Sequence, residues 1–425
     1  MINWLIEYMV RVNPQVQKAL HITYPQVFLD EFQDTTFAQF GMLQTVFAAS
    51  DAVFTAVGDD KQRIMGWAGA MPDAFNVFTQ QFNARRVSLI LNWRSHEALV
   101  AIQRVIAARI DPHVAPVEAR GVQTVDGDVA AIWNFDTREE ECETLAAWIR
   151  QQVDSGIVEA HDIAILVRMR ADQVEQELAP AFAAKQLLLR NLARNVGSIA
   201  IQDLLSEELT TIILPLLRLG ATKKDAQAWS DAQRSLRYIH AIADSDEIAQ
   251  QEMQQALESF SRELRAYMAA NAPDAEVVRE LTRRAIEFVG VETIRQAFPE
   301  YGRDADFERV REGFEILLIE AADGGGTWPE ALDRFEGRGR VPLMTVHKSK
   351  GLEFHTMVFF GLDNGTWWSL APNRPEELNS FFVAFTRAEQ RAFFTSCAAR
   401  GNRIGWIDNL LAPAGVARIP GTEIV

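Results

Sequence analysis

The sequence has 425 residues, of which 48% are hydrophobic and 24% charged, and its formal net charge is −16. This length predicts two to four domains, and the composition is typical of an ordinary globular protein. No apolar run approaches the roughly 18 residues that a membrane-spanning helix needs. The acidic balance argues against a protein that coats nucleic acid by bulk electrostatics, but it is compatible with a narrow, locally basic channel.

The first fifteen residues predict an amphipathic helix rather than a secretion signal. Apolar residues that include Leu5, Met9 and Val10 recur at helical spacing. Glu7 lies among them and there is no basic leader, so we expect no targeting segment here.

The two cysteines, Cys142 and Cys397, predict no metal site and no disulfide framework. They are far apart in the sequence, and no metal-ligand spacing surrounds either of them. We expect two buried, reduced thiols, which fits a reducing cytoplasm as the location of the protein.

The stretch "VFLDEFQDTT", Val27 to Thr36, predicts a strand that delivers two carboxylates, Asp30 and Glu31, to its carboxyl end. In α/β folds that hydrolyse nucleotides, this is where the magnesium ion and the water-activating base are held. Taken alone the pattern is weak, because a solvated strand end has the same appearance.

Two further strands are predicted in the next sixty residues. "VFTAVG" followed by the turn "GDD" places Asp59 to Gln62 at a strand end. Val87 to Leu91 predicts a third strand, with Ser95 as the N-cap of a helix from Glu97 to Ala107.

The remainder of the chain first alternates between strands and helices and then becomes almost wholly helical. Beyond a turn-rich loop at residues 121–128, the predicted elements are a strand Val129 to Phe135, a helix Glu139 to Val153, a strand Asp162 to Arg168 and a helix Asp172 to Lys185. This alternation is typical of a parallel sheet covered by helices. Leu204 to about Arg334 predicts helices, and strands return at Leu343 to Val346 and Thr356 to Phe360. The simplest interpretation is a helical domain inserted into an α/β domain.

Five segments in a fixed order carry a family resemblance, although each alone has a structural explanation. The segments are "LDEFQDT" from Leu29, "VGDDKQRIMGWAGA" from Val57, "LNWRS" from Leu91, "TVHKSKGLEFHTMVFFGL" from Thr345 and "EELNSFFVAFTRA" from Glu376. Together they resemble the second to sixth motifs of the superfamily 1A helicases, the group of UvrD, Rep and PcrA. "AILVRMR" from Ala164 resembles a further strand of that family. The resemblance runs from near Met1 to about Asn409.

The resemblance implies an α/β fold with two RecA-like lobes, the first of them incomplete, and a helical domain inserted in the second. The expected segments are the end of the first lobe at 1–86, the second lobe at 87–215 and 338–425, and the inserted domain at 216–337.

For the nucleotide, the resemblance implies ATP with Mg²⁺. Asp30 would coordinate the magnesium ion, since a hard cation prefers oxygen ligands. Glu31 would orient and deprotonate the attacking water, and Gln62 would sense the γ-phosphate. Arg94 and Arg387 would place positive charge against the transferring phosphoryl group, where catalysis is mostly positioning and electrostatic stabilisation.

The base and the sugar of ATP would be recognised by two further residues. Trp93 stands where the family usually has Tyr, and its indole would stack on the adenine; the alternative is a plain core tryptophan. Glu353 would accept a hydrogen bond from the ribose hydroxyl.

For DNA, the resemblance implies single strands and junctions between single- and double-stranded DNA as partners, and no membrane. Trp67 would stack on a base, and His347 and Lys348 would face the single strand. Lys348 and Lys350 would add phosphate contacts.

The chain departs from the family in one large respect. The phosphate-binding pattern G-x-x-x-x-G-K-[ST] occurs nowhere in the 425 residues. A truncated chain, a split enzyme whose other polypeptide carries the loop, and a degenerate protein that binds DNA without hydrolysing ATP would each explain this. Smaller departures are Met65 in place of Tyr, Ala68 in place of Arg, and Trp367-Trp368 in place of Phe-Pro.

Two functions follow as alternatives. The first is an ATP-dependent DNA helicase or translocase that moves 3′ to 5′, represented without the front of its first lobe, so that the chain alone is not expected to hydrolyse ATP. The second is a non-catalytic DNA-binding subunit of a bacterial DNA-repair or phage-defence complex, in which a protein partner replaces the missing segment.

Overall fold

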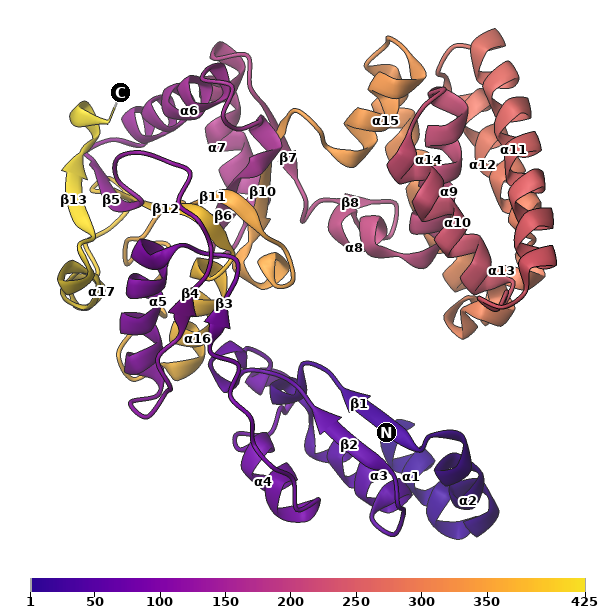
Figure 1. Ribbon diagram of the computed structural model, residues 1–425. Helices are drawn as coiled ribbons and strands as arrows, with labels where there is room; N and C mark the ends of the chain where they lie inside the picture. Colours follow the sequence, from indigo (N-terminus) through magenta and orange to yellow (C-terminus); the bar gives the residue numbers. More distant parts are fainter. Residues whose placement is uncertain (1, 425) are drawn as a thin grey trace. The chain divides into compact units, whose positions relative to one another are not determined.

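The computed structural model describes residues 2–424 (Figure 1). Internal contacts divide the chain into two units. The first comprises Met1–Trp148, Ile165–Met169 and Thr345–Val425, and the second comprises Ile149–Ala164 and Arg170–Met344. Within the described residues, no helix combines the length and apolar character needed to cross a membrane.

The first unit begins with a small α/β layer. Strands β1 and β2 pair in parallel, with Gln26 opposite Val53 and Leu29 opposite Ala56, which confirms the first two predicted strands. Leu29 packs on an aromatic cluster around Phe32, whereas Phe28 on the opposite face is 73% exposed. The elements are α1 (Ile2–Val12), α2 (Pro14–Thr23), β1 (Gln26–Leu29), α3 (Phe37–Phe47), β2 (Val53–Ala56) and α4 (Ala74–Gln81).

Helix α1 confirms the predicted N-terminal helix, but not the face that it was expected to bury. Leu5 and Met9 are exposed, whereas Val10 and Glu7 are buried. Glu7 is buried because this side of α1 packs against α3. The Glu7 carboxylate accepts a hydrogen bond from the hydroxyl of Thr45 on α3 at 3.2 Å, and it also pairs with Arg11 of its own helix.

The third predicted strand is wrong over most of its length. Residues 87–90 are exposed and adopt no regular structure, and strand β3 is only Leu91–Asn92, paired in parallel with β4 (Glu118–Ala119). Helix α5 (Glu97–Ile110) is present, but His96, not Ser95, is its N-cap. The Ser95 hydroxyl instead donates to the Ala388 carbonyl oxygen at 2.9 Å, so it is not free to cap the helix.

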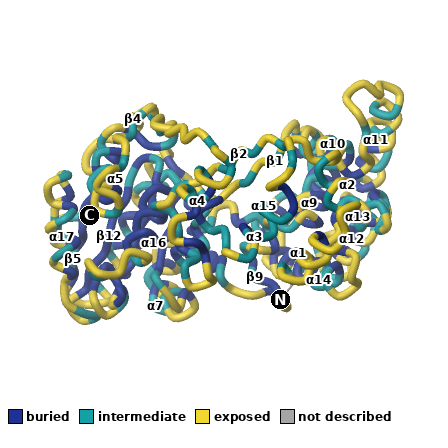
Figure 2. The backbone as a smooth tube through the Cα atoms, turned by 90° about the horizontal axis from the view of Figure 1, so that it is seen from below, coloured by how far each residue is buried: buried dark blue, intermediate teal, exposed yellow. Residues whose placement is uncertain are grey.

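The main sheet of the first unit has its strands in the order β13-β5-β12-β11-β6, and every pairing whose direction is resolved is parallel. The five residues of β6 are all buried, as expected for a strand covered on both faces. Figure 2 shows this region largely buried, whereas β1 and β2 have exposed residues. The strands are β5 (Ala130–Phe135), β6 (Ile163–Val167), β11 (Phe354–Phe359), β12 (Ala388–Cys397) and β13 (Ala417–Pro420); of these, β12 and β13 were not predicted.

Three helices accompany these strands: α6 (Arg138–Asp154), which was predicted, α16 (Pro375–Phe385) and α17 (Gly405–Leu411). Helix α16 directly precedes β12, and its last eight residues are buried. Both cysteines are buried and neither is part of a disulfide, as predicted.

The second unit consists of a parallel strand pair and a bundle of helices (Figure 1). The predicted helical region is confirmed, with buried residues such as Leu217, Val278 and Phe314 in its core. Its elements are α7 (Ala171–Ala184), β7 (Leu188–Asn191), β8 (Asn195–Val196), β9 (Ile199–Ala200), α8 (Ile201–Ser206), α9 (Glu208–Ala221), α10 (Ala226–Ile239), α11 (Glu247–Ala270), α12 (Ala275–Val289), α13 (Val291–Ala297), α14 (Asp304–Asp323), α15 (Trp328–Glu336) and β10 (Arg340–Thr345). The α/β class with parallel sheets and a helical region is therefore confirmed, while the predicted segment boundaries stay a prediction.

Candidate nucleotide and DNA site

Asp30 and Glu31 follow directly on β1, at the carboxyl end of the parallel pair. Both side chains are exposed, and Asp30 Oδ1 accepts the backbone N–H of Glu31 at 2.8 Å. Glu31 has a φ of +48°, a left-handed conformation that a non-glycine residue adopts only at a cost. The chain thus turns sharply at the end of the strand and presents two adjacent carboxylates.

A residue that the sequence analysis did not single out, Gln33, connects the two strand ends. It is fully buried, its Oε1 accepts the backbone N–H of Asp59 at 3.0 Å, and its Nε2 donates to the Glu31 carboxylate. A Cβ atom on Gly58 would lie 2.1 Å from Gln33 Oε1, so this link requires glycine at position 58. Gln33 therefore fixes the orientation of Glu31 relative to the segment that carries Gln62.

Lys350 lies against the carboxylates of the "LDEFQDT" segment. Its Nζ is 2.6 Å from Asp34 Oδ2 and 2.9 Å from Glu31 Oε2. Burial alone would lower the pKa of Lys350, but hydrogen bonds to the two carboxylates raise it above its ordinary value. In this structure the charge of Lys350 is compensated by Glu31 and Asp34, and its predicted contact with a DNA phosphate stays a prediction.

Gln62 and Arg387 are joined directly. Arg387 Nη2 donates to Gln62 Oε1 at 3.0 Å, and Arg387 Nε donates to the Val383 carbonyl oxygen at 3.1 Å. The guanidinium is buried, and burial together with the nearby charge of Arg94 lowers its pKa, although an arginine stays charged. Two residues predicted to act on the γ-phosphate are therefore adjacent in the structure.

Trp93, Arg94 and Glu353 line a single cavity of about 440 Å³. Trp93 is 72% exposed, which excludes the alternative of a plain core tryptophan. Arg94 forms an ion pair with Glu353 and donates from Nη1 to the Thr386 carbonyl oxygen at 3.1 Å. The hydrogen bond from Arg94 lowers the pKa of Glu353, which keeps this carboxylate ionised and able to accept a hydrogen bond.

The donor set fits a magnesium ion that is shared with a nucleotide. Within residues 2–424 no group of three or more His, Cys, Asp and Glu side chains is arranged to hold a metal ion. Mg²⁺ at nucleotide sites is held by one or two carboxylates together with phosphate oxygens and water. Asp30, exposed at the end of β1, would supply such a carboxylate.

The residues predicted to bind DNA lie on two short turns. Trp67 is 75% exposed on the 3₁₀ turn Gly66–Ala68. His347 and Lys348 lie on the 3₁₀ turn Val346–Ser349 and are half-buried. Burial and then the charge of Arg168 lower the pKa of His347, which favours its neutral imidazole.

Arg168 and Glu377 stand close to His347 and were not predicted. Arg168 donates from Nε and Nη2 to the two carboxylate oxygens of Glu377, at 2.9 and 2.5 Å. The only sequence signal was the polar residue after the apolar run "AILV", which is too common to assign a role.

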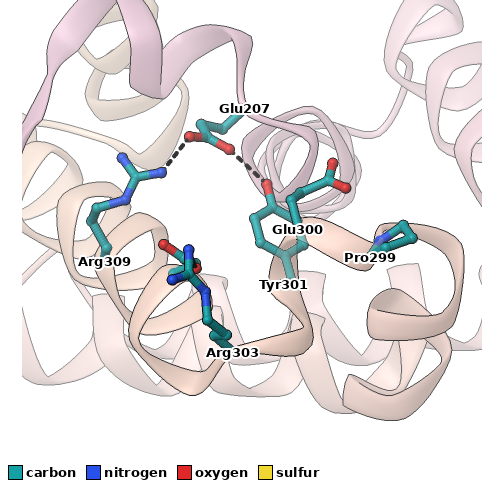
Figure 3. Close-up of a pocket in the computed structure, with 7 residues that line it drawn as sticks. Glu207, Pro299, Glu300, Tyr301, Arg303 and Arg309 are labelled. Carbon is teal, nitrogen blue, oxygen red and sulfur yellow. Dashed lines mark hydrogen bonds and ion pairs between the residues drawn. The ribbon is translucent and has the colours of Figure 1, made fainter. Parts of the chain in front are cut away.

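A second cavity, of about 560 Å³, lies in the helical unit and contains none of the predicted site residues (Figure 3). The Glu207 carboxylate accepts hydrogen bonds from the Tyr301 hydroxyl at 2.8 Å and from Arg309 Nη2 at 2.9 Å. Tyr301 is buried, and burial together with the Glu207 charge raises the pKa of its phenol. This network ties the start of α9 to the turn Pro299–Gly302 and to α14, which indicates a structural role.

We expect Glu207→Gln to lower the free energy of unfolding by about 1–3 kcal/mol, because the amide NH2 group cannot accept a hydrogen bond. One of the two donors would lose its acceptor, and the other would keep only an uncharged one. Urea denaturation followed by circular dichroism would measure this. Glu300→Gln removes the same charge from an exposed residue of the same cavity wall and should change stability by less than about 0.5 kcal/mol. Equal effects of the two substitutions would contradict the structural role of Glu207.

The geometry defines a class of protein: an α/β protein in which carboxylates that follow one parallel strand pair contact Lys350, and Gln62 after the second strand of that pair contacts Arg387. Comparison with protein families then shows what the two ends of the chain are similar to. Residues 1–83 match the UvrD/REP helicase N-terminal domain, and residues 326–399 match the UvrD-like helicase C-terminal domain. In these two segments the chain is similar to the UvrD-like helicases.

Individual relatives are distant. The chain is 24% identical to the ATP-dependent DNA helicase Rep of Buchnera aphidicola subsp. Acyrthosiphon pisum, over 94% of this chain and 66% of that protein. It is 22% identical to Rep of Escherichia coli, over 91% of this chain and 62% of that protein. It is 25% identical to the helicase PcrA of Bacillus subtilis, over 91% of this chain and 57% of that protein. The chain therefore spans between 57 and 66% of the length of these relatives.

Proposed function

We propose that the protein is an ATP-dependent DNA translocase and helicase that moves 3′ to 5′ on single-stranded DNA. The observation that carries the proposal is the contact between Gln62 and Arg387, with the cavity of Trp93, Arg94 and Glu353 beside it. Residues that are 259 to 325 positions apart in the sequence thus come together, which supports a shared nucleotide site.

In this proposal each of the candidate residues has one role in ATP hydrolysis. Asp30 binds Mg²⁺, which would offset the charge of the β- and γ-phosphates. Glu31, oriented by Gln33, accepts the proton of the attacking water. Arg387 and Arg94 stabilise the negative charge that develops on the transferring phosphoryl group.

The proposal also assigns residues to the adenine and ribose of ATP and to the DNA strand. Trp93 stacks on adenine, and Glu353 accepts a hydrogen bond from ribose once Arg94 turns to the phosphates. Trp67, His347 and Lys348 bind the single strand, and Lys350 adds a contact with a phosphate. We assign the first RecA-like lobe to 1–86, the second to 87–215 and 338–425, and the inserted domain to 216–337.

The proposal requires a phosphate-binding loop from outside these 425 residues, because no G-x-x-x-x-G-K-[ST] sequence lies within them. Either another segment of the same polypeptide or a partner protein could carry it. The deciding experiment uses the protein together with the segment or partner that carries the loop. It measures ATP hydrolysis with and without oligo(dT), and displacement of the short strand from a duplex with a 3′ tail. Hydrolysis stimulated by DNA supports the proposal, and strand displacement shows helicase activity in addition to translocation.

A second candidate function is a non-catalytic DNA-binding subunit, favoured by the absence of that loop from the sequence. This alternative predicts binding of single-stranded DNA without ATP hydrolysis, both for the chain alone and for its native complex. The same two assays therefore separate the two candidates.

We expect Trp67→Ala to weaken the binding of single-stranded DNA by about 5- to 150-fold, because stacking on one base contributes about 1–3 kcal/mol. Fluorescence anisotropy with a labelled oligo(dT) would measure the dissociation constant. Trp4→Ala is the matched control, since Trp4 is also exposed but lies on α1. A dissociation constant that is the same for Trp67→Ala and for Trp4→Ala would exclude Trp67 as a stacking residue.

A further inference from the structure

The loop that carries Trp67 is held at both of its ends. At the first end, Asn379 Nδ2 of helix α16 donates to the Arg63 carbonyl oxygen at 3.0 Å. At the second end, Ala70 forms an antiparallel bridge with Thr36, close behind Glu31 in the sequence. The loop between these two anchors therefore connects the region of Glu31 with helix α16.

Asn379 is buried far more deeply than its polarity alone would suggest. It is 3% exposed, and its Oδ1 has no hydrogen-bond partner within residues 2–424. A buried amide with one unmet acceptor is costly relative to an apolar side chain of the same shape. Packing alone therefore does not explain an asparagine at this position. The one hydrogen bond that its side chain makes is to the loop, at the Arg63 carbonyl oxygen.

Helix α16 contacts the same segment at three further points. Arg387, just beyond its end, donates to Gln62, and the Lys61 ammonium lies 6.0 Å from the centre of the Phe382 ring. At the start of the helix, Glu376 approaches Gly66 so closely that a Cβ atom there would lie 2.1 Å from its carboxylate oxygen. The helix thus reaches from the residue beside Trp67 to the residue that binds Gln62.

We propose that Asn379 is a positioning residue that couples DNA at Trp67 to the nucleotide at Gln62 and Arg387. The effect of Asn379 on ATP hydrolysis rests on the proposed function, whereas its contact with the loop does not. By fixing the Arg63 carbonyl, Asn379 makes the segment from Gln62 to Trp67 move together with α16. DNA that displaces Trp67 therefore shifts Gln62 relative to the phosphoryl group.

The first test is Asn379→Leu in the whole protein, with Ser380→Ala as control. Leucine has a similar volume and removes both the donor and the unmet acceptor, so the fold is retained. Ser380 is the neighbouring buried residue, but its hydroxyl donates within the helix, to the Glu376 carbonyl oxygen at 2.9 Å. We expect the stimulation of kcat by oligo(dT) to fall by about 5- to 150-fold in Asn379→Leu, while the KM for ATP without DNA is unchanged. Ser380→Ala should retain full stimulation.

The second test measures the mobility of the loop and does not depend on ATP hydrolysis. Hydrogen exchange followed by mass spectrometry should show faster exchange at residues 60–69 in Asn379→Leu than in the wild type or in Ser380→Ala. Unchanged exchange there, or full DNA stimulation in Asn379→Leu, would overturn the inference. A wild-type protein without DNA-stimulated hydrolysis would instead contradict the proposed function, and the exchange experiment would still decide the role of Asn379.

Discussion

Glu31→Gln, in the protein together with the segment that carries the phosphate-binding loop, should abolish measurable ATP hydrolysis, with kcat lowered by about 10²- to 10⁴-fold, the usual contribution of a general base. The amide keeps the shape of the side chain and its place at the end of β1, but it cannot accept a proton from water. The binding of nucleotide and of single-stranded DNA should persist, because Asp30, Trp93 and Trp67 are untouched. Steady-state release of phosphate in the presence of oligo(dT) would measure the loss.

A matched control is available on the same unit. Glu97 is an exposed carboxylate at the first turn of α5, paired with Arg104, and Glu97→Gln removes the same charge away from the site. This variant should hydrolyse ATP at the wild-type rate. If Glu31→Gln keeps the wild-type rate as well, another group deprotonates the water and the assignment of Glu31 is wrong. If no variant hydrolyses ATP and DNA is still bound, the non-catalytic alternative is favoured.

The strands that position the carboxylates could be predicted because their patterns reflect burial. β5 and β6 are short apolar runs bounded by turns and acidic helix starts, and both are almost fully buried. β1 and β2 end in polar clusters, so Asp30 and Gln62 could be placed at strand ends. For these strands, the apolar run and the residues directly beside it are enough to predict the structure.

Structure that depends on a partner far away in the sequence could not be predicted. Val87 to Leu91 is as apolar as a true strand, yet only Leu91 belongs to a strand, because a strand also needs a partner and β4 offers only two residues. Nothing near Lys350 shows that it would meet Glu31 and Asp34, which are more than 300 positions away. The same holds for the buried contact between Asn379 and Arg63.

Two pairs of candidate site residues lie together in the structure, while their roles stay a prediction. The Gln62–Arg387 bond and the Trp93–Glu353 cavity join pairs that the family resemblance had already named. Gln33 was missed since a glutamine beside two carboxylates carries no signal of its own, and its role emerges only from its burial and from the close approach of Gly58. Residues that contact the ligand can be recognised by type, whereas residues that position them require the structure.

Arg387→Lys should lower the DNA-stimulated kcat by about 10³- to 10⁵-fold, the range measured for arginines that stabilise transferring phosphoryl groups. Lysine keeps the positive charge, but it lacks the planar fork that lets Arg387 donate to Gln62 and to the Val383 carbonyl oxygen at once. A single ammonium cannot hold both contacts and also reach a phosphate. The loss should therefore appear in kcat, with the KM for ATP little changed.

Arg391→Lys provides the comparison, because Arg391 lies on β12 and donates to the Asp126 carbonyl oxygen, away from the nucleotide residues. It should keep the wild-type kcat. Since Arg387 is buried, its substitution could also reduce stability, and thermal unfolding of both variants separates the two effects. A variant Arg387→Lys that melts early but turns over ATP at the normal rate would make Arg387 a structural residue. A variant that melts normally and loses turnover places its guanidinium at the transferring phosphoryl group, next to Gln62.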